Sequence, residues 1–276
     1  MLNKYAKYAL IFGFTPKKLY LRFSGNQNIP KIYCCTFPKS GTHLLERVLC
    51  LYPYFYRHFS ITLDELRHMN ITNEEFGKVL SHVANGQFFL SHLYYSRERY
   101  KIVKESDFKV LVMIRDPRDM VISDAYYVVK DHAHLNHKLF LGMPLKERIK
   151  LCIEGNLRHD VNYVDIGTKI ENYFGWINSD DAFVIKFEDI VGDKGGGNNV
   201  LQKKTVTSLY QHLGISLHDH EVDKILNGLF SNNSRTFRKG TIGQWREVFD
   251  EELKSIFKEI AGKQLIQLGY ESNNDW

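Results

Sequence analysis

Short apolar runs alternate with longer amphipathic stretches along this chain. Four of these runs predict β-strands, at residues 32–36, 87–90, 108–114 and 182–187. The run at 108–114 (FKVLVMI) is almost continuously apolar, as expected for a parallel strand that is buried on both faces. Because strands and helices alternate, we expect an α/β fold with a central parallel sheet flanked by helices.

Apolar positions at helical spacing predict the helices between these strands. The predicted helices begin near residue 44 and at Pro117, and cover residues 62–83, 145–174, 206–213 and 253–260. Asp116 supplies an N-cap and Pro117 a suitable first helical residue, which fixes one helix start. The polar stretch at 130–138 is interpreted as a mobile excursion. The stretch at 191–199, which contains three consecutive glycines, is interpreted as a flexible surface connection.

The 276 residues suit a single domain at 30–276, preceded by a helical extension at 1–29. A removed signal peptide is disfavoured because the apolar run Tyr8–Phe14 is short and no small-residue cleavage site follows it. The run is also far shorter than a membrane span. The extension fits an amphipathic helix that packs on the domain or on a membrane surface.

Composition excludes some partners and favours others. With 37 basic and 32 acidic side chains, the net charge of +5 is too small to indicate a nucleic-acid binder, but it suits a site for a small polyanion. The four cysteines lack metal-ligand spacing, so free thiols and a cytoplasmic location are expected. No metal site is predicted at His132, His134 and His137, because no cysteine or carboxylate accompanies them at ligand spacing.

The stretch Thr36-Phe-Pro-Lys-Ser-Gly-Thr42 joins the first predicted strand to a helix. Such a turn directs free backbone N–H groups and the positive end of the helix dipole at one point, where an anion can bind. Lys39 adds a positive charge. An ordinary ATPase or GTPase is disfavoured, because Lys39 precedes the only glycine of this loop instead of following it.

A polar residue follows each predicted strand. These residues are Lys39, His92, Arg115 and the pair Glu188-Asp189. In open parallel sheets the ligand crevice lies outside the carboxyl ends of the strands, so these side chains are expected to converge there.

Three segments together resemble the sulfotransferases that use 3′-phosphoadenosine 5′-phosphosulfate. Residues 36–42 are similar to their 5′-phosphosulfate loop, T-Y-P-K-S-G-T. Residues 115–123 (RDPRDMVIS) are similar to their 3′-phosphate segment, R-[ND]-P-[KR]-D-x-x-x-S. Residues 238–245 are similar to R-K-G-x-x-G-x-W, which closes over the same phosphate. The family's order is kept over most of the chain, and the resemblance implies a P-loop-like nucleotide-binding architecture.

The resemblance also implies an activity. A sulfuryl group would move in line from the donor to a hydroxyl or amine, and adenosine 3′,5′-bisphosphate would leave. His92 would act as the general base, and Lys39 would stabilise the leaving phosphate. A histidine at a strand end is by itself more often structural, so this role depends on the other motifs. No metal is expected, because the leaving group is already an anionic phosphate.

The resemblance also assigns residues to donor binding. These are Lys39, Ser40, Gly41, Thr42, His43, Arg115, Ser123, Phe187, Phe230, Arg238, Lys239 and Gly240. The chain departs from the family at Leu90, where a lysine would add positive charge near the leaving phosphate. It also departs at Leu44, which replaces an adenine-stacking aromatic, and at Phe187, which replaces a tyrosine. Phe230 is a candidate to supply the missing stacking.

Two other functions stay open. A P-loop nucleotide kinase would need a Mg²⁺-binding carboxylate after a strand, for which Asp116 is the only candidate near 108–114. A non-catalytic protein that binds a nucleotide bisphosphate would form no product. The acceptor is not defined by the sequence. The aromatic residues Tyr94, Tyr95, Tyr126 and Tyr127 suit a phenol, a lipid alcohol or a sugar.

Overall fold

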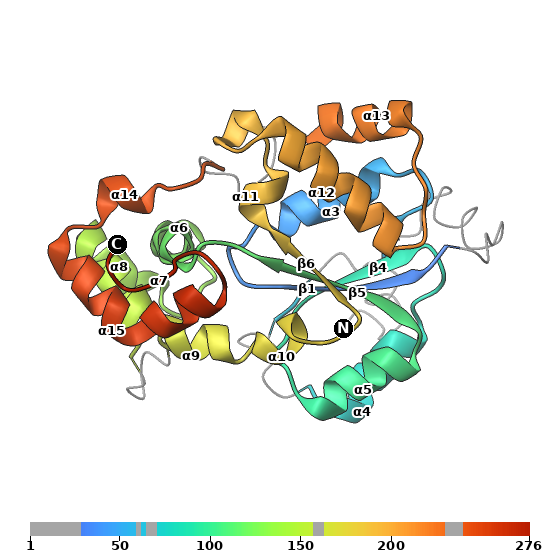
Figure 1. Cartoon of the computed structure of the whole chain (residues 1–276). Helices are drawn as coiled ribbons and strands as arrows, with labels where there is room; N and C mark the ends of the chain where they lie inside the picture. Colours follow the sequence, from blue (N-terminus) through green and yellow to red (C-terminus); the bar gives the residue numbers. More distant parts are fainter. Residues whose placement is uncertain (1–28, 59–61, 65–70, 157–162, 230–239) are drawn as a thin grey trace.

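A parallel β-sheet forms the centre of the fold (Figure 1). Its strands are β1 (Lys31–Thr36), β2 (Tyr56–Arg57), β3 (Leu63–Asp64), β4 (Gln87–His92), β5 (Phe108–Ile114) and β6 (Ala182–Lys186). The strand order is β2-β4-β1-β5-β6, and β3 also pairs with β4. Every pairing is parallel. The predicted α/β fold with a central parallel sheet is thereby confirmed.

The computed structural model describes residues 29–58, 62–64, 71–156, 163–229 and 240–276. The helical extension expected at 1–29 therefore lies outside the described residues, apart from Ile29. Across the described ranges, no helix is both long enough and apolar enough to span a bilayer.

Helices cover both faces of the sheet (Figure 1). One face carries α3 (Thr42–Leu51), α11 (Phe187–Ile190), α12 (Asn199–His212) and α13 (Asp219–Leu229). The other face carries α4 (Asn73–Ser81), α5 (Arg97–Glu105) and α10 (Phe174–Ile177).

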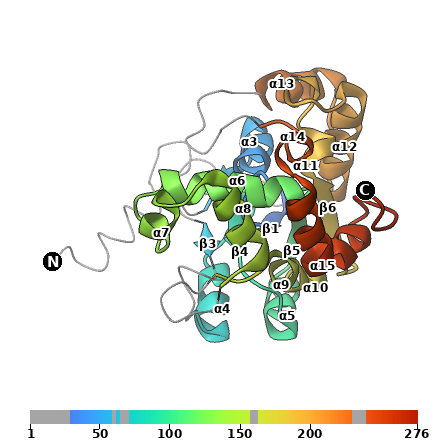
Figure 2. The same ribbon diagram turned by 90° about the vertical axis from the view of Figure 1, so that its left-hand side faces the viewer.

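A third group of helices lies beyond the carboxyl ends of the strands, on the side that faces the viewer in Figure 2. It comprises α6 (Pro117–Lys130), α7 (His137–Leu141), α8 (Leu145–Glu154), α9 (Ile166–Glu171), α14 (Trp245–Val248) and α15 (Glu251–Gln267). This group surrounds the edge at which the sequence predicts the ligand site.

The central strand β1 divides the apolar core into two layers. Ile32 and Cys34 point into the layer beneath α3 and α12, whereas Tyr33 and Cys35 point into the layer that contains Trp176. All five side chains are fully buried. Burial of a large apolar side chain contributes roughly 1.5–3 kcal/mol. Both layers therefore hold β1 firmly, and with it the loop that follows.

Two predicted helical stretches are wrong in extent. In the stretch predicted at 62–83, Leu63 and Asp64 instead pair with β4 as a short strand, and the helix begins only after Thr72. Thr72 and Glu75 form a reciprocal capping box that fixes this start. In the stretch predicted at 145–174, α8 ends at Gly155, whose φ of 68° leaves the helical region.

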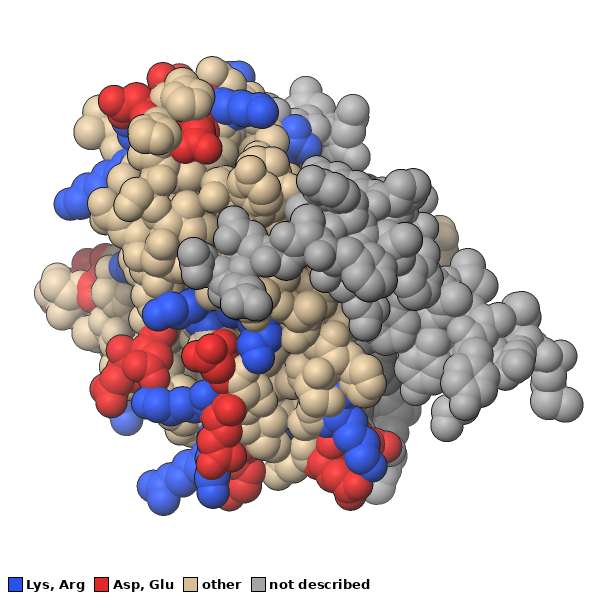
Figure 3. All heavy atoms as spheres, turned by 90° about the vertical axis from the view of Figure 1, so that its right-hand side faces the viewer, with Lys and Arg blue, Asp and Glu red and all other residues tan. Residues whose placement is uncertain are grey.

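The amino-end side of the sheet presents both signs of charge in alternation (Figure 3). Ion pairs account for part of this pattern, such as Lys104 with Asp181 at 2.7 Å. The described part of that face carries no basic stripe. The four cysteines are free thiols, as predicted, and only Cys50 is exposed.

Candidate active site

The loop between β1 and α3 has the geometry of an anion-binding turn. Lys39 and Gly41 both adopt left-handed backbone conformations, with φ of 69° and 106°. The Ser40 hydroxyl donates to the Phe37 carbonyl of the loop at 2.7 Å or to the Met113 carbonyl of β5 at 3.0 Å. Its backbone N–H donates to Phe37 as well, at 3.1 Å. Ser40 therefore shapes the turn, and both of its donors already have acceptors in the chain.

The first amides of α3 are unpaired within the described part of the chain. The N–H groups of Gly41, Thr42 and His43 have no acceptor there, as expected for the first turn of a helix. These three donors and the helix dipole make this end of α3 a site for an anion.

Gly41 is required at its position for two reasons. A Cβ there would lie 2.7 Å from the Phe187 ring and 2.9 Å from the Met113 methyl group. Its φ of 106° is also strained for any other residue. The Phe187 ring, only 5% exposed, thus packs directly against the loop at Gly41.

His92, at the end of β4, points back to the same loop. Its Nδ1 lies 2.6 Å from the Thr36 carbonyl oxygen and 3.1 Å from the Thr36 hydroxyl. A carbonyl can only accept, so the neutral ring carries its proton on Nδ1 and leaves Nε2 with a lone pair. Burial lowers the pKa of His92 below its usual 6.5, although the nearby Asp64 opposes the shift. The imidazole is therefore neutral at pH 7.

Lys39 is held by an aromatic face. Its Nζ lies 3.4 Å from the centre of the Tyr127 ring, and the Tyr127 hydroxyl donates to Asp131 at 2.7 Å. Burial lowers the pKa of Lys39 to about 8, and Asp124 partly opposes this shift. The ammonium group is charged at neutral pH without a close carboxylate partner in the described chain.

Arg115 follows β5 and is 6% exposed. Its Nη2 donates to the Thr241 carbonyl at 2.9 Å and faces Asp119 at 3.4 Å. The guanidinium also lies over the Phe187 ring, at 4.4 Å. Within the described chain its Nε is buried without an acceptor. A buried donor of this kind is costly unless a ligand or water satisfies it.

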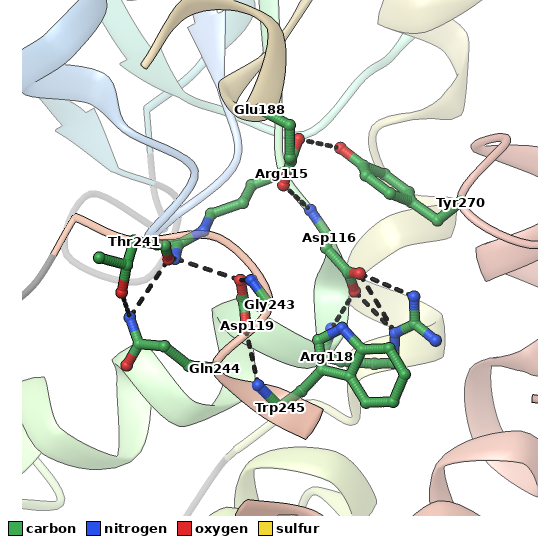
Figure 4. Close-up of polar contacts among 10 residues, drawn as sticks. All are labelled: Arg115, Asp116, Arg118, Asp119, Glu188, Thr241, Gly243, Gln244, Trp245 and Tyr270. Carbon is green, nitrogen blue, oxygen red and sulfur yellow. Dashed lines mark hydrogen bonds and ion pairs between the residues drawn. The ribbon is translucent and has the colours of Figure 1, made fainter. Parts of the chain in front are cut away.

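Asp119 ties a distant segment to α6 (Figure 4). Its carboxylate accepts from the backbone N–H groups of Gly243, at 2.8 Å, and Trp245, at 3.0 Å. Burial raises the pKa of Asp119, and Arg115 counteracts the shift. From the sequence alone, no role at the site was predicted for Asp119. Its place in the RDPRD motif was the available signal for such a role.

The carboxylate oxygens of Asp116 and Glu188 already accept hydrogen bonds within the chain. Both Asp116 oxygens accept from the Arg118 guanidinium, and one also caps the Arg118 N–H at 2.9 Å. Glu188 accepts from the Asp116 N–H at 3.0 Å and from the Tyr270 hydroxyl at 2.9 Å (Figure 4). The predicted N-cap role of Asp116 is confirmed.

The remaining candidate residues differ in burial, and some lie outside the described residues. Ser123 is half-buried on α6, and His43 is exposed beside Glu46 at 3.2 Å. Phe230, Arg238 and Lys239 lie outside the described residues, which resume at Gly240.

The loop that carries three glycines contacts the site, so its interpretation as a plain surface connection is wrong. Gly195 is buried, and its carbonyl accepts from the Ile242 N–H at 3.0 Å. A Cβ on Gly195 would lie 2.7 Å from the Gly240 carbonyl oxygen. The glycine therefore permits a close approach of two backbones.

The histidines after α6 pair with each other. Nδ1 of His132 lies 3.2 Å from Nε2 of His137, whose Nδ1 faces the Val128 carbonyl at 3.1 Å. In the described ranges, no cluster of three or more His, Cys, Asp or Glu side chains is arranged to hold a metal ion.

Known sulfotransferases are similar to this chain in sequence over most of its length. A mouse protein, sulfotransferase 2A6, is 23% identical over 266 residues, covering 84% of this chain and 82% of its own. A 3-beta-hydroxysteroid sulfotransferase of Cavia porcellus is 23% identical over 260 residues, covering 82% of both chains.

Solved structures share the fold. Mouse sulfotransferase SULT7A1 complexed with PAP superposes with a TM-score of 0.61 at 19% identity, over 90% of this chain and 88% of that one. Retinol dehydratase, in complex with androsterone and inactive cofactor PAP, gives 0.59 at 16% identity over 97% and 95%. These likenesses support a sulfotransferase-type arrangement of sheet and helices.

The family model described as "Sulfotransferase domain" matches residues 30–269, most of the chain. The resemblance carried by the three sequence motifs is thus confirmed, and this chain belongs to the sulfotransferase family.

Proposed function

We propose that this enzyme transfers the sulfuryl group of 3′-phosphoadenosine 5′-phosphosulfate to a hydroxyl of a small acceptor, with His92 as general base. The observation that carries the proposal is the contact between His92 Nδ1 and the Thr36 carbonyl, at the start of the anion-binding loop. This contact holds the neutral imidazole of His92 beside the anion-binding loop, which supports its use as the base.

The loop supplies donors for the 5′-phosphosulfate. The amides of Gly41, Thr42 and His43 point from the end of α3, and Lys39 adds a charge. The Thr42 hydroxyl lies 2.8 Å from the Thr36 hydroxyl. If Thr36 donates in this pair, the Thr42 proton is available to the phosphate. We assign the Ser40 side chain to holding the turn, because its acceptors are already within the chain.

Arg115 and Ser123 are proposed to bind the 3′-phosphate. The unsatisfied Nε of Arg115 is a charged donor that a phosphate oxygen would complete. Gly240, beside the Thr241 carbonyl that already binds Arg115, brings the third motif to the same place. Arg238 and Lys239 immediately precede it in the chain and are proposed to add positive charge there. The buried Phe187 ring stacks against the Arg115 guanidinium, so we propose that it supports Arg115 and does not stack on adenine.

His92 is suited to remove the acceptor's proton. Its Nε2 is the free basic atom once Nδ1 donates to Thr36, and the lowered pKa keeps the ring neutral at pH 7. Tyr173 donates to the His92 carbonyl at 2.7 Å and so fixes the backbone that carries the ring. Proton removal strengthens the nucleophile as the sulfur–oxygen bond to the acceptor forms. The sulfuryl group leaves the phosphate, and Lys39 is placed to stabilise the charge that builds on that oxygen.

The two rival functions are less well supported. A kinase reading needs Asp116 on a metal ion, but both its oxygens are bound by Arg118. A non-catalytic binder would not need a histidine oriented by a backbone carbonyl. Aromatic rings pack beside His92, with the buried Tyr173 against Phe37 at 4.4 Å and against Tyr94 at 5.5 Å. The hydroxysteroid names of some relatives support an alcohol as the acceptor.

The test is a transfer assay with sulfur-labelled donor and a panel of phenols, steroid alcohols, sugars and amines. We expect a labelled product with at least one alcohol, at a rate that EDTA leaves unchanged. His92→Ala should abolish most of the turnover, whereas His82→Ala, which removes an exposed histidine at the end of α4, should not. Tight binding of the bisphosphate without transfer to any acceptor would show a binder and refute the proposal.

A further inference from the structure

Arg118 is a buried arginine in the described structure, only 1% exposed. Its Nε and Nη2 bind Asp116, with the Nη2 contact at 2.8 Å, and its Nη1 binds Glu271 at 2.6 Å. Two carboxylates therefore satisfy the charge. One comes from the start of α6 and the other from the C-terminal segment, residues 270–276.

Two indole rings enclose the same guanidinium. Its central carbon lies 3.7 Å from the centre of the Trp245 ring and 4.5 Å from that of Trp276. The two rings pack edge to face, with centres 5.4 Å apart. Stacking on aromatic faces suits a planar guanidinium better than an ammonium group. Arg118 thus connects the C-terminal segment with Trp245.

The C-terminal segment reaches α6 by a second route. The Tyr270 hydroxyl donates to Glu188, which accepts from the Asp116 N–H on its other oxygen (Figure 4). Asp116 in turn fixes Arg118. Three side chains of residues 270–276 therefore converge on the first turn of α6, from which Asp119 holds Gly243 and Trp245.

The geometry points to a positioning role for the C-terminal segment in binding the donor's 3′-phosphate, an inference that rests on the proposed function. Trp276 and Glu271 hold Arg118, Arg118 holds the Trp245 ring, and Asp119 holds the Trp245 backbone. Residues 240–245 are thereby fixed beside Arg115, to which Thr241 gives its carbonyl. None of these C-terminal residues touches the loop at Lys39 in the described structure. Their effect should therefore reach the 3′ end of the donor alone.

The first measurement needs no ligand. Hydrogen exchange of peptides that cover residues 241–249 is compared in the wild-type chain, Trp276→Ala and Trp276→Phe. Ser272→Ala, an exposed change in the same segment, is the matched control. We expect faster exchange in Trp276→Ala, near-normal exchange in Trp276→Phe, and no change in the control. Unchanged exchange in Trp276→Ala would overturn the inference, as would an equal rise in α12, which marks general loosening.

The second measurement separates positioning from stability. Calorimetry gives the affinity of each variant for adenosine 3′,5′-bisphosphate and for adenosine 5′-monophosphate. Trp276→Ala should weaken binding of the bisphosphate at least about fivefold, the scale of a cation–π contact. It should leave the affinity for the monophosphate almost unchanged. Equal losses for both ligands would overturn the inference.

A milder variant covers the case in which Trp276→Ala does not fold. Glu271→Gln keeps the stacked rings and removes one charge partner of Arg118, and it should shift both measurements in the same direction by a smaller amount. No shift in either would overturn the inference. If the wild-type chain binds both nucleotides equally well, the proposed function fails at its 3′-phosphate site, and the exchange data still decide whether residues 270–276 hold residues 241–249.

Discussion

The pH dependence of transfer provides a direct test of the two residues at the reacting end of the donor. In the proposed mechanism, His92 must be neutral to accept a proton, and Lys39 must be charged to stabilise the leaving phosphate. Burial lowers the pKa of both groups, to below 6.5 for His92 and to about 8 for Lys39. Activity should therefore rise as pH increases through the His92 pKa and fall as pH increases through the Lys39 pKa.

The size of the alkaline effect follows from the Lys39 value. With a pKa of about 8, about nine tenths of the enzyme carries a charged Lys39 at pH 7 and about one tenth does at pH 9. The ratio kcat/KM for the donor should then fall about tenfold over this range, because it reports groups in the free enzyme. A lysine with its ordinary pKa near 10.4 would change the same ratio by only about 4%.

Bound donor should shift this response. Its anionic phosphosulfate favours the charged ammonium group, so the alkaline fall in kcat should lie at higher pH than the fall in kcat/KM. The assay should use an alcohol acceptor that does not itself titrate between pH 6 and 10. Acid-side data are less specific, because a phosphate monoester such as the 3′-phosphate also titrates near pH 6.

Lys39→Arg is the decisive variant. Arginine stays charged throughout this range, so the alkaline fall should disappear even if the overall rate is lower. Lys138→Arg, an exposed change after α6, should keep the wild-type profile. If kcat/KM in the wild type is flat from pH 7 to 9, or if the fall persists in Lys39→Arg, Lys39 is not the titrating group.

Three further substitutions test separate parts of the site. His92→Ala should lower kcat by about 10²–10⁴-fold with little change in donor affinity measured by calorimetry, and a near-normal kcat would move the base elsewhere. Arg115→Ala should weaken the bisphosphate at least about tenfold but leave adenosine 5′-monophosphate nearly unaffected, as expected for a lost charge-assisted bond. Asp119→Ala should lower the free energy of unfolding in urea by about 3 kcal/mol, because it removes the carboxylate that faces Arg115 and the acceptor of two backbone amides, whereas the exposed Asp180→Ala should leave it unchanged.

The sheet was predictable from the sequence because its signal is local. The four longer strands are apolar runs, and each ends close to where its run ends. The two-residue strands β2 and β3 were missed, because two residues carry no periodicity. Helix α5 was missed for a related reason. Val103 is its only buried residue, so a charged surface helix shows almost no apolar stripe.

The site was only partly predictable, because its key contacts join residues far apart in the sequence. The sequence singled out Lys39, His92 and Arg115 as candidates, since each lies at or just after the end of a strand. The groups that orient these side chains were not predicted. Thr36 acts on His92 through a backbone carbonyl, which has no sequence signature, and Tyr127 holds Lys39 from a helix 88 residues further along the numbering.

Arg115 and Arg118 show why a motif alone does not assign roles. They lie three residues apart in one segment and carry the same charge, but their surroundings differ. Arg118 is neutralised by Asp116 and Glu271 at 2.8 and 2.6 Å. Among the described carboxylates, only Asp119 faces Arg115, at 3.4 Å, and it also accepts two backbone N–H groups.

The groups that hold Lys39 and Arg115 have a consequence for the donor. Aromatic faces and a peptide carbonyl orient these cations without cancelling a full charge, as Tyr127 does for Lys39 and Phe187 for Arg115. A close carboxylate would compete with the donor's phosphates for each cation. The carboxylate that faces Arg115, Asp119 at 3.4 Å, is also bound by two backbone N–H groups. Because the donor is a polyanion, a site built on rings and carbonyls keeps its positive potential for the ligand, while the fully paired Arg118 serves the framework beside it.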